Sequence, residues 1–430
     1  METKAMRRSN TSFAGWLTAT TCIVAASMPA AAQPASPNLW TDTVKFNLQI
    51  QGGIIGNSAK QTTGSGGNFG QLFTDKANDF QLNQVLATVA RPLDPKATGF
   101  DFGFKLQGLF GTDARYTRWV NFGQGPTGRY QGDITEANIL VHTPWITEGG
   151  LDFKLGMFST PMGFETIDPI TNPFYSHSYI FNFGLPLKHT GVLATLHATD
   201  IVDLYLGVTS GVNTTLGAYR GDNNSAGSFM AGVGLNLMGG DLTILGLTHI
   251  GPENPGQAGG TASIPLANRS NRYYFDVLTT YKATEKLTLI AELNYVRDEL
   301  PGLTPSAYGA AVYAGYELTD MVTLNARAEV FRDEKNFFVA AFPGANDFNN
   351  FQSGRATGPI VSGVAGQATT YGAITVGLTV KPPIEMLKLP GALMIRPEVR
   401  YDTSLNGKKP FRGGRDTGAF TFGTDFVLTF

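Results

Sequence analysis

The chain has almost no cysteine, since Cys22 is the only one among its 430 residues. Cys22 lies in an N-terminal stretch that we expect to be removed, which excludes disulfides and thiolate metal sites from the mature chain. The chain also lacks any apolar run of about eighteen residues, and this excludes a transmembrane helix. It has no polybasic segment either, which argues against nucleic acid as a partner.

The N-terminus has the pattern of a secretory signal peptide. Three bases, Lys4, Arg7 and Arg8, precede a short apolar stretch and an Ala-Ala-Ala cleavage site. We predict that residues 1–32 are the signal peptide and that 33–430 form one domain, because no linker or change of composition divides them. The 32 basic and 34 acidic residues of the whole chain become 29 and 33 in the mature chain, a formal charge of −4.

The C-terminus alternates apolar and polar residues over 420–430 and ends on an aromatic residue. The apolar set is Phe420, Phe422, Phe426, Leu428 and Phe430. A period of two predicts a strand. A closing strand that ends on an aromatic side chain is typical of a transmembrane barrel, where aromatic residues lie at the membrane interfaces. The pattern resembles the C-terminal signature of bacterial outer-membrane proteins, which the barrel-assembly machinery reads.

The same period of two recurs along the whole chain. It is clearest at 44–50, 100–106, 202–208, 229–237, 273–281, 287–295, 322–330, 393–401 and 420–430, and weaker at 80–91, 134–143, 151–158, 189–197, 242–250, 306–318 and 370–380. We therefore predict an all-β fold, a transmembrane antiparallel up-and-down β-barrel of about 16 strands. An even number of strands returns both termini to the same side of the membrane.

The connections between these segments alternate in length. The short ones are 92–99, 144–150, 198–200, 238–241, 282–286, 319–321 and 381–391. The long ones are 57–78, 112–131, 159–188, 210–227, 251–271, 297–305, 332–369 and 403–417. This alternation predicts short periplasmic turns and long extracellular loops, which a soluble β-sandwich has no reason to show.

The two faces of the predicted strands differ in polarity. Arg327 lies on the polar face of 322–331, and Arg396 and Arg400 lie on that of 393–402, while the other face of both strands is apolar. Charges on one face only indicate water inside the barrel and lipid outside. Aromatic residues gather at the strand ends. Those that we expect at the membrane interfaces are Phe430, Tyr401, Tyr295 and Tyr281.

The third long connection, 159–188, differs from the others in being rich in aromatic residues, with Phe-Tyr-Ser-His-Ser-Tyr-Ile-Phe at 174–181. Such a run is costly on an open aqueous surface, so we expect it to fold against the inner wall. Sixteen strands enclose a lumen too wide for wall side chains to fill, and this segment would narrow it. The expected constriction residues are Glu165, Asp168, Arg327, Arg396 and Arg400. Acids facing bases would set a transverse field that filters solutes.

Two alternatives to such a charge filter stay open. Glu165 could simply accept hydrogen bonds that hold the loop in place. The arginines could pair with Glu329 and Glu398 of the same wall, which would leave no net selectivity. The five histidines show no metal-ligand spacing, and we predict neither a metal nor a cofactor.

Three segments around this connection resemble a known family. Residues 156–165 read Gly-Met-Phe-Ser-Thr-Pro-Met-Gly-Phe-Glu, 172–179 read Asn-Pro-Phe-Tyr-Ser-His-Ser-Tyr, and 186–192 read Pro-Leu-Lys-His-Thr-Gly-Val. They resemble the OmpL-like β-barrel porin family of the porin-2 type, which shows Gly-x-Phe, Pro-x-Gly-x-Glu, an Asn with Ser-x-Ser-Tyr, and a Thr-Gly-Val strand. A weaker likeness is to the phosphate-selective porins O and P. The resemblance implies an outer-membrane pore for small solutes and no particular substrate.

These observations together predict an outer-membrane porin of a Gram-negative bacterium, exported through the periplasm and not an enzyme. It would pass small hydrophilic solutes by passive diffusion through a water-filled channel. The alternatives are a substrate-selective channel for phosphate or another anion, an outer-membrane lipid hydrolase, and an adhesin barrel with a plugged lumen. The expected partners are outer-membrane lipid and lipopolysaccharide, the barrel-assembly machinery, small hydrophilic solutes and, as one option, identical copies in a homotrimer.

Overall fold

The structure is a computed structural model. It describes residues 43–58, 67–119, 128–215, 222–254, 269–300, 302–340, 366–383 and 391–430. The predicted signal peptide, residues 1–32, lies outside the described residues. None of the helices in the described part of the chain is long and apolar enough to cross a membrane.

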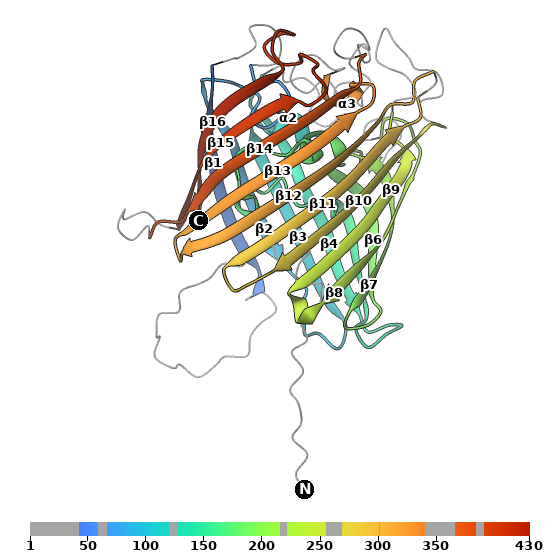
Figure 1. The fold of residues 1–430 in the computed structure, drawn as a ribbon. Helices are drawn as coiled ribbons and strands as arrows, with labels where there is room; N and C mark the ends of the chain where they lie inside the picture. The colour runs from blue at the N-terminus through green and yellow to red at the C-terminus, as the bar shows by residue number, and fades with distance from the viewer. Residues whose placement is uncertain are drawn as a thin grey trace.

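Within these residues, sixteen antiparallel strands close into one barrel (Figure 1), which confirms the predicted fold. Each strand pairs with its neighbours in sequence, and the last strand pairs with the first. The strands are β1 (Lys45–Asn57), β2 (Phe80–Arg91), β3 (Asp101–Gly111), β4 (Gln131–Thr143), β5 (Leu151–Ser159), β6 (Lys188–His197), β7 (Val202–Val212), β8 (Ser228–Leu237), β9 (Leu242–Pro252), β10 (Asn271–Lys282), β11 (Leu287–Asp298), β12 (Ser306–Thr319), β13 (Val322–Asp333), β14 (Thr369–Val380), β15 (Ala392–Ser404) and β16 (Gly418–Thr429).

The wall of the barrel has an apolar outer face and a largely polar inner face. In β16, Phe420 is 56% exposed, whereas Asp425, on the opposite face, is 2% exposed. In β13, Val330 points outward, and Arg327 is buried on the inside. Successive side chains of a strand point to opposite faces, so the period of two read from the sequence separates these two environments. The predicted assignment of faces is confirmed in both strands.

Closure of the barrel depends on β16 meeting β1. Phe430 and Leu48 exchange backbone hydrogen bonds, at 2.8 Å from the Phe430 amide and 3.2 Å from the Leu48 amide. The register continues from Gln49 opposite Thr429 along both strands. The Phe430 side chain remains 43% exposed. The terminal residue therefore completes the hydrogen bonding of the last strand while its ring stays on the outside.

The connections lie at the two ends of the barrel as antiparallel order requires, with the short turns at the lower end in Figure 1. The predicted strict alternation of length is wrong at one place, because the connection 381–391 is longer than 299–305. The order of the strands determines at which end of the barrel a connection lies, but it does not determine the length of that connection. Residues 384–390 of the longer connection lie outside the described part of the chain.

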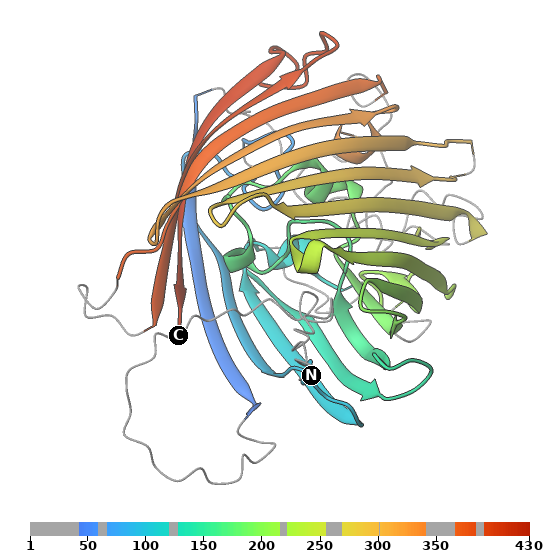
Figure 2. The same cartoon turned by 60° about the horizontal axis from the view of Figure 1, so that its bottom comes forward.

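The interior of the barrel is partly filled by residues 160–187, the connection between β5 and β6, which we call the inner segment. It runs inside the ring of strands (Figure 2, green) and contains two short helices, η2 (Pro169–Thr171) and η3 (Ile180–Gly184). Its ends are adjacent, since the Thr160 amide donates to the Leu187 carbonyl at 2.9 Å. The remaining short helices are α2 (Ala114–Thr117), η4 (Met238–Gly240) and α3 (Phe337–Ala340).

Apolar side chains of the inner segment pack against apolar side chains on the inner wall of the barrel. The buried members of this core on the inner segment are Met162, Phe174, Tyr179, Ile180 and Leu185. Those on β6 to β11 include Leu193, Tyr205, Met230, Leu245, Leu247 and Ile290. Removing this apolar area from water stabilises the inner segment against the wall by roughly 25 cal/mol for each Å² buried. The aromatic residues of 174–181 thus lie inside the barrel.

Candidate pore constriction

Acids on the wall opposite β5 and β6 accept backbone amides of the inner segment. The Tyr175 and Ser176 amides donate to Glu398 of β15 at 2.9 Å and 3.1 Å. The Tyr179 amide donates to Glu329 of β13 at 2.6 Å. A segment that crosses a barrel outside any sheet leaves its backbone N–H groups without strand partners. These two carboxylates supply the missing acceptors and fix the segment to the far wall.

Arginines of the same wall donate to backbone carbonyls of the inner segment. Arg396 donates to the Pro169 carbonyl at 2.8 Å and to the Asn172 carbonyl at 2.7 Å. Arg400 donates to the His177 carbonyl at 3.0 Å. Charged donors make stronger hydrogen bonds than neutral donors do. Two of the three arginines that we predicted at the constriction, Arg396 and Arg400, therefore hold the backbone of the inner segment.

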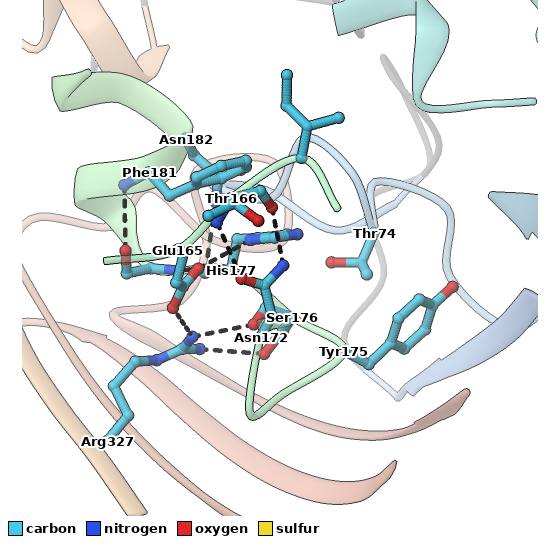
Figure 3. Close-up of polar contacts among 12 residues, drawn as sticks. Thr74, Glu165, Thr166, Asn172, Tyr175, Ser176, His177, Phe181, Asn182 and Arg327 are labelled. Atoms are coloured by element: carbon cyan, nitrogen blue, oxygen red, sulfur yellow. Dashed lines mark hydrogen bonds and ion pairs between the residues drawn. The ribbon is translucent and has the colours of Figure 1, made fainter. Parts of the chain in front are cut away.

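Glu165 of the inner segment contacts the predicted wall base Arg327 directly (Figure 3). The Arg327 guanidinium donates to Glu165 at 2.7 Å and to the Ser176 carbonyl at 2.9 Å. Glu165 also lies 2.8 Å from His177 Nδ1 and accepts from the Tyr313 hydroxyl at 3.1 Å. Glu165 and Arg327 are both buried. The pair is an internal anchor of the inner segment.

The pKa of Glu165 reports how strongly this anchor favours the carboxylate. Burial alone would raise the pKa, but the charge of Arg327 and the hydrogen bond from His177 outweigh burial and lower it from 4.5 to about 2. A depressed pKa means that ionised Glu165 stabilises the folded barrel. A shift of this size corresponds to about 3 kcal/mol at neutral pH.

We expect acid to remove the stabilisation that Glu165 provides. The contribution should be complete above the unfolded pKa of 4.5 and should disappear as the pH falls toward the folded pKa of about 2. The measurement is the free energy of unfolding against pH for the wild type and for Glu165→Gln. The two curves should differ most near neutral pH and converge below pH 4.5. A constant gap between them across this range would contradict the assignment.

Gly163 lets the inner segment pack closely on itself, and Gly184 lets it approach the wall. Gly163 has a φ of +82°, and a Cβ there would lie 2.2 Å from a Leu185 methyl carbon. Its amide donates to Asp276 of β10 at 3.1 Å. At Gly184 a Cβ would lie 2.3 Å from the Asn294 amide oxygen. Only glycine supplies this backbone conformation and this closeness without strain.

Asp168 occupies a different place from Glu165. It caps η2 by accepting the Ile170 amide at 3.3 Å, and it accepts from Gln49 of β1 at 3.3 Å. Burial raises the pKa of Asp168, while the charge of Lys105 on β3 opposes that rise. The base whose charge acts on Asp168 is therefore Lys105, which was not among the predicted wall bases.

The other two predicted arginines also form ion pairs with neighbouring acids. Arg396 pairs with Asp425 of β16 at 2.5 Å. Arg400 pairs with Glu329 at 3.0 Å and with Asp402 at 2.7 Å. The structure thus places these arginines in contact pairs within the wall, without open water between them and the acids.

The two alternatives to a charge filter are both realised in part. Glu165 accepts hydrogen bonds that hold the inner segment in place, as one of them required. Glu329 pairs with Arg327 and Arg400, as the other required. Glu398 differs, since it accepts backbone amides of the inner segment. This role could not be read from the sequence, because it depends on the path of the inner segment.

Sequence reasoning missed three charged residues on the inner faces of β3 to β5. Lys105 lies 3.4 Å from Glu136 of β4, and Lys154 of β5 faces the same side of the wall. Both lysines are partly exposed, although they point into the barrel. A signal was present at Lys105, which is the polar residue between Phe104 and Leu106 in an alternating strand.

The residues considered for other roles have clear positions. Ser176, His177 and Ser178 are buried inside the barrel, away from the lipid-facing positions that a lipid hydrolase would need. The aromatic residues expected at the membrane interfaces are all partly or largely exposed on the outer face. They are Tyr281, Tyr295, Tyr401 and Phe430.

A closed sixteen-strand barrel with an apolar outside, a polar inner wall and a connection folded into the lumen is the architecture of outer-membrane porins. The family described as "Putative beta-barrel porin-2, OmpL-like" matches residues 43–430, and the chain belongs to this family. Comparison with curated protein sequences finds no match.

Solved structures support the fold. OmpT of Vibrio cholerae is 13% identical with a TM-score of 0.50, covering 90% of this chain and 97% of that one. An anion-selective porin from Comamonas acidovorans is 9% identical with a TM-score of 0.52, covering 90% and 99%. OmpF of Salmonella typhi, in complex with daunomycin, is 11% identical with a TM-score of 0.52, covering 91% and 99%. At these identities the likeness shows the porin barrel alone.

Proposed function

We propose that this porin forms a water-filled channel through which small hydrophilic solutes cross the outer membrane by passive diffusion. The observation that carries the proposal is the partial exposure of inward-facing lysines beside the inner segment. The Lys105 side chain is 24% exposed although it points into the barrel. Thr166 and Thr171 of the inner segment are partly exposed as well. Water therefore has access to the lumen between β3 to β5 and the inner segment.

Planar lipid bilayers test this function directly. Addition of the refolded protein should produce stepwise increases in ionic conductance, one step for each inserted pore. Gel migration before and after heating should show that the same sample contains closed barrels. Closed barrels without conductance at any voltage would refute the proposal and favour the adhesin barrel with a plugged lumen.

We assign two roles to the residues predicted at the constriction. Glu165, Arg327, Arg396 and Arg400 hold the inner segment against the far wall, so they shape the opening without lining it. Asp168 lies at the edge of the opening, within electrostatic reach of Lys105. The narrowest part then lies between η2 and the inner face of β3 to β5.

The cellular setting follows from the sequence. Residues 1–32 would direct export into the periplasm of a Gram-negative bacterium, and 33–430 would then insert into its outer membrane. The partners in this setting are outer-membrane lipid, lipopolysaccharide and the barrel-assembly machinery. A homotrimer is the oligomer that we propose to test, by chemical cross-linking in isolated membranes.

Removal of Phe430 is expected to reduce assembly much more than conductance. The deletion removes both backbone hydrogen bonds to Leu48 and an exposed aromatic ring at the end of the closing strand. The lumen keeps its lining, because the Phe430 side chain points outward. The yield of heat-modifiable barrel in membranes should fall severalfold, while single-channel conductance of the barrels that form stays unchanged.

The control for this deletion is Phe420→Ala, which removes a ring near the other end of the closing strand that is 56% exposed, against 43% for Phe430. It leaves the pairing with β1 at Leu48 intact. Its assembly should remain close to that of the wild type. Normal assembly without Phe430 would count against its assignment as the last anchor of the barrel.

A further inference from the structure

The acids and arginines that anchor the inner segment offer little charge to a passing solute, because they are buried. Arg327, Arg396 and Arg400 each pair with at least one carboxylate and are 1% exposed. A charge that is paired and covered by protein is a weak source of field for an ion in the lumen. The selectivity of the opening must come from groups that reach its water.

Two lysines on the inner face of the wall are such groups. Lys105 of β3 and Lys154 of β5 flank β4, and both side chains are partly exposed. The Lys154 ammonium lies 5.8 Å from the centroid of the Phe158 ring. Among the described residues, no carboxylate oxygen lies within 4.0 Å of it. Lys154 therefore lies on the inner face beside an aromatic ring, without a carboxylate in contact among the described residues.

The acids near these lysines are covered by other groups. Glu136 lies between them and is engaged by Lys105 at 3.4 Å and by the Asn138 amide at 2.6 Å. Asp168, on the facing edge of the inner segment, is held by Gln49 and by the backbone amide that follows it in η2. Both acids are less than 9% exposed.

One further acid, Asp152, lies two residues from Lys154 on the same face of β5. Its two oxygens meet His142 at 2.6 Å and His197 at 3.2 Å. His197 in turn contacts Asp203 of β7 at 2.7 Å. In this chain both oxygens of Asp152 are engaged by imidazoles. The Lys105 side chain is 24% exposed, more than the 8% of Glu136 and the 17% of Asp152, and Lys154 is partly exposed as well.

Resting on the proposed pore, we infer that Lys105 and Lys154 form the charge filter of the opening and that it favours small anions. Two cations of the same sign, exposed on one wall where the inner segment narrows the path, raise the local concentration of anions and lower that of cations. Asp168 and Glu136 set how strong the preference becomes. The filter thus lies on β3 and β5, away from the arginines of β13 and β15.

Reversal potentials across a bilayer with a potassium chloride gradient test this inference. The wild type should pass chloride more readily than potassium, and the preference should grow at low salt because screening weakens. Lys105→Gln with Lys154→Gln should reduce the chloride-to-potassium permeability ratio severalfold at similar conductance. Lys105→Arg with Lys154→Arg should retain it. Glu136→Gln should increase the ratio.

The matched control is Lys286→Gln, which removes the same charge from the exposed turn between β10 and β11. Its permeability ratio should equal that of the wild type. A cation preference in the wild type, or an anion preference that the double glutamine variant keeps, would overturn the inference and leave the pore intact. An absence of conductance in the wild type would instead refute the proposed function, and the filter with it.

Discussion

Arg327→Met is expected to lower the free energy of unfolding of this barrel strongly and to loosen the inner segment in the lumen. The guanidinium holds Glu165 and two groups of Ser176 at the centre of the inner segment. Without it, the Glu165 carboxylate stays buried beside His177 with no fixed cation. Removal of one partner from a buried pair costs about 3–5 kcal/mol. Urea unfolding in lipid vesicles should show this loss, and conductance should become larger and noisier as the segment loosens.

The control for Arg327→Met is Arg332→Met, the same substitution on the same strand. Arg332 pairs with Glu334 at 3.1 Å, but its side chain is 25% exposed. Exposed pairs contribute roughly 0–1 kcal/mol, so this variant should unfold almost like the wild type. The double variant Glu165→Gln with Arg327→Met should be more stable than the sum of the two single losses predicts. Equal stability of the Arg327→Met and Arg332→Met barrels would contradict the anchor.

The barrel itself was predictable because the alternation of apolar and polar residues can be read within each strand. The alternation at 322–330 places Leu324 outside and Arg327 inside without any knowledge of distant residues. The same period of two gave the count of sixteen strands. Every strand shows it, because each strand faces lipid on one side and water on the other. Closure of the last strand on the first followed from the aromatic end at Phe430 and the even count.

The pairing of charges was less predictable, because it depends on register and on the path of the inner segment. Arg396 meets Asp425 because the two residues lie directly opposite each other on β15 and β16. That register was not fixed by composition. Glu398 accepts hydrogen bonds from backbone amides of the inner segment, and the pattern of side chains in the sequence does not indicate which backbone amides will be donors. Only the final fold shows which wall charges are used in this way.

The place of the opening on the inner segment stays a prediction, and the structure shows only which groups lie around the residues that we named for it. Asp168 is buried on the inner segment, and the base whose charge acts on it is Lys105, where an arginine was expected. Lysine and arginine differ in this respect. The planar guanidinium with five donors suits contact with carboxylates and carbonyls, whereas an ammonium on a flexible stem keeps its head in water. The arginines therefore hold the inner segment against the wall, whereas Lys105 and Lys154 stay partly exposed on the inner face.

Shortening the inner segment is expected to have the largest effect on conductance. Since the Thr160 amide bonds the Leu187 carbonyl, residues 161–186 can be replaced by a two-residue turn without moving β5 or β6. The lumen then loses both short helices and the aromatic core that fills it. Single-channel conductance should rise severalfold. The free energy of unfolding should fall less than the lost contacts suggest. Water would hydrate the wall groups that the inner segment now covers, and the ion pair between Arg396 and Asp425 would remain.

Removal of 407–409, in the connection between β15 and β16, is the control for loop shortening as such. These residues lie at the end of the barrel opposite the short turns, and their loss should leave conductance near the wild-type value. The shortened barrel should also lose part of its anion preference, because solutes then pass farther from Lys105 and Lys154 than the inner segment now forces them to. A closed, correctly folded barrel that keeps wild-type conductance without 161–186 would show that ions do not pass beside the inner segment. The opening would then have to be sought elsewhere in the lumen.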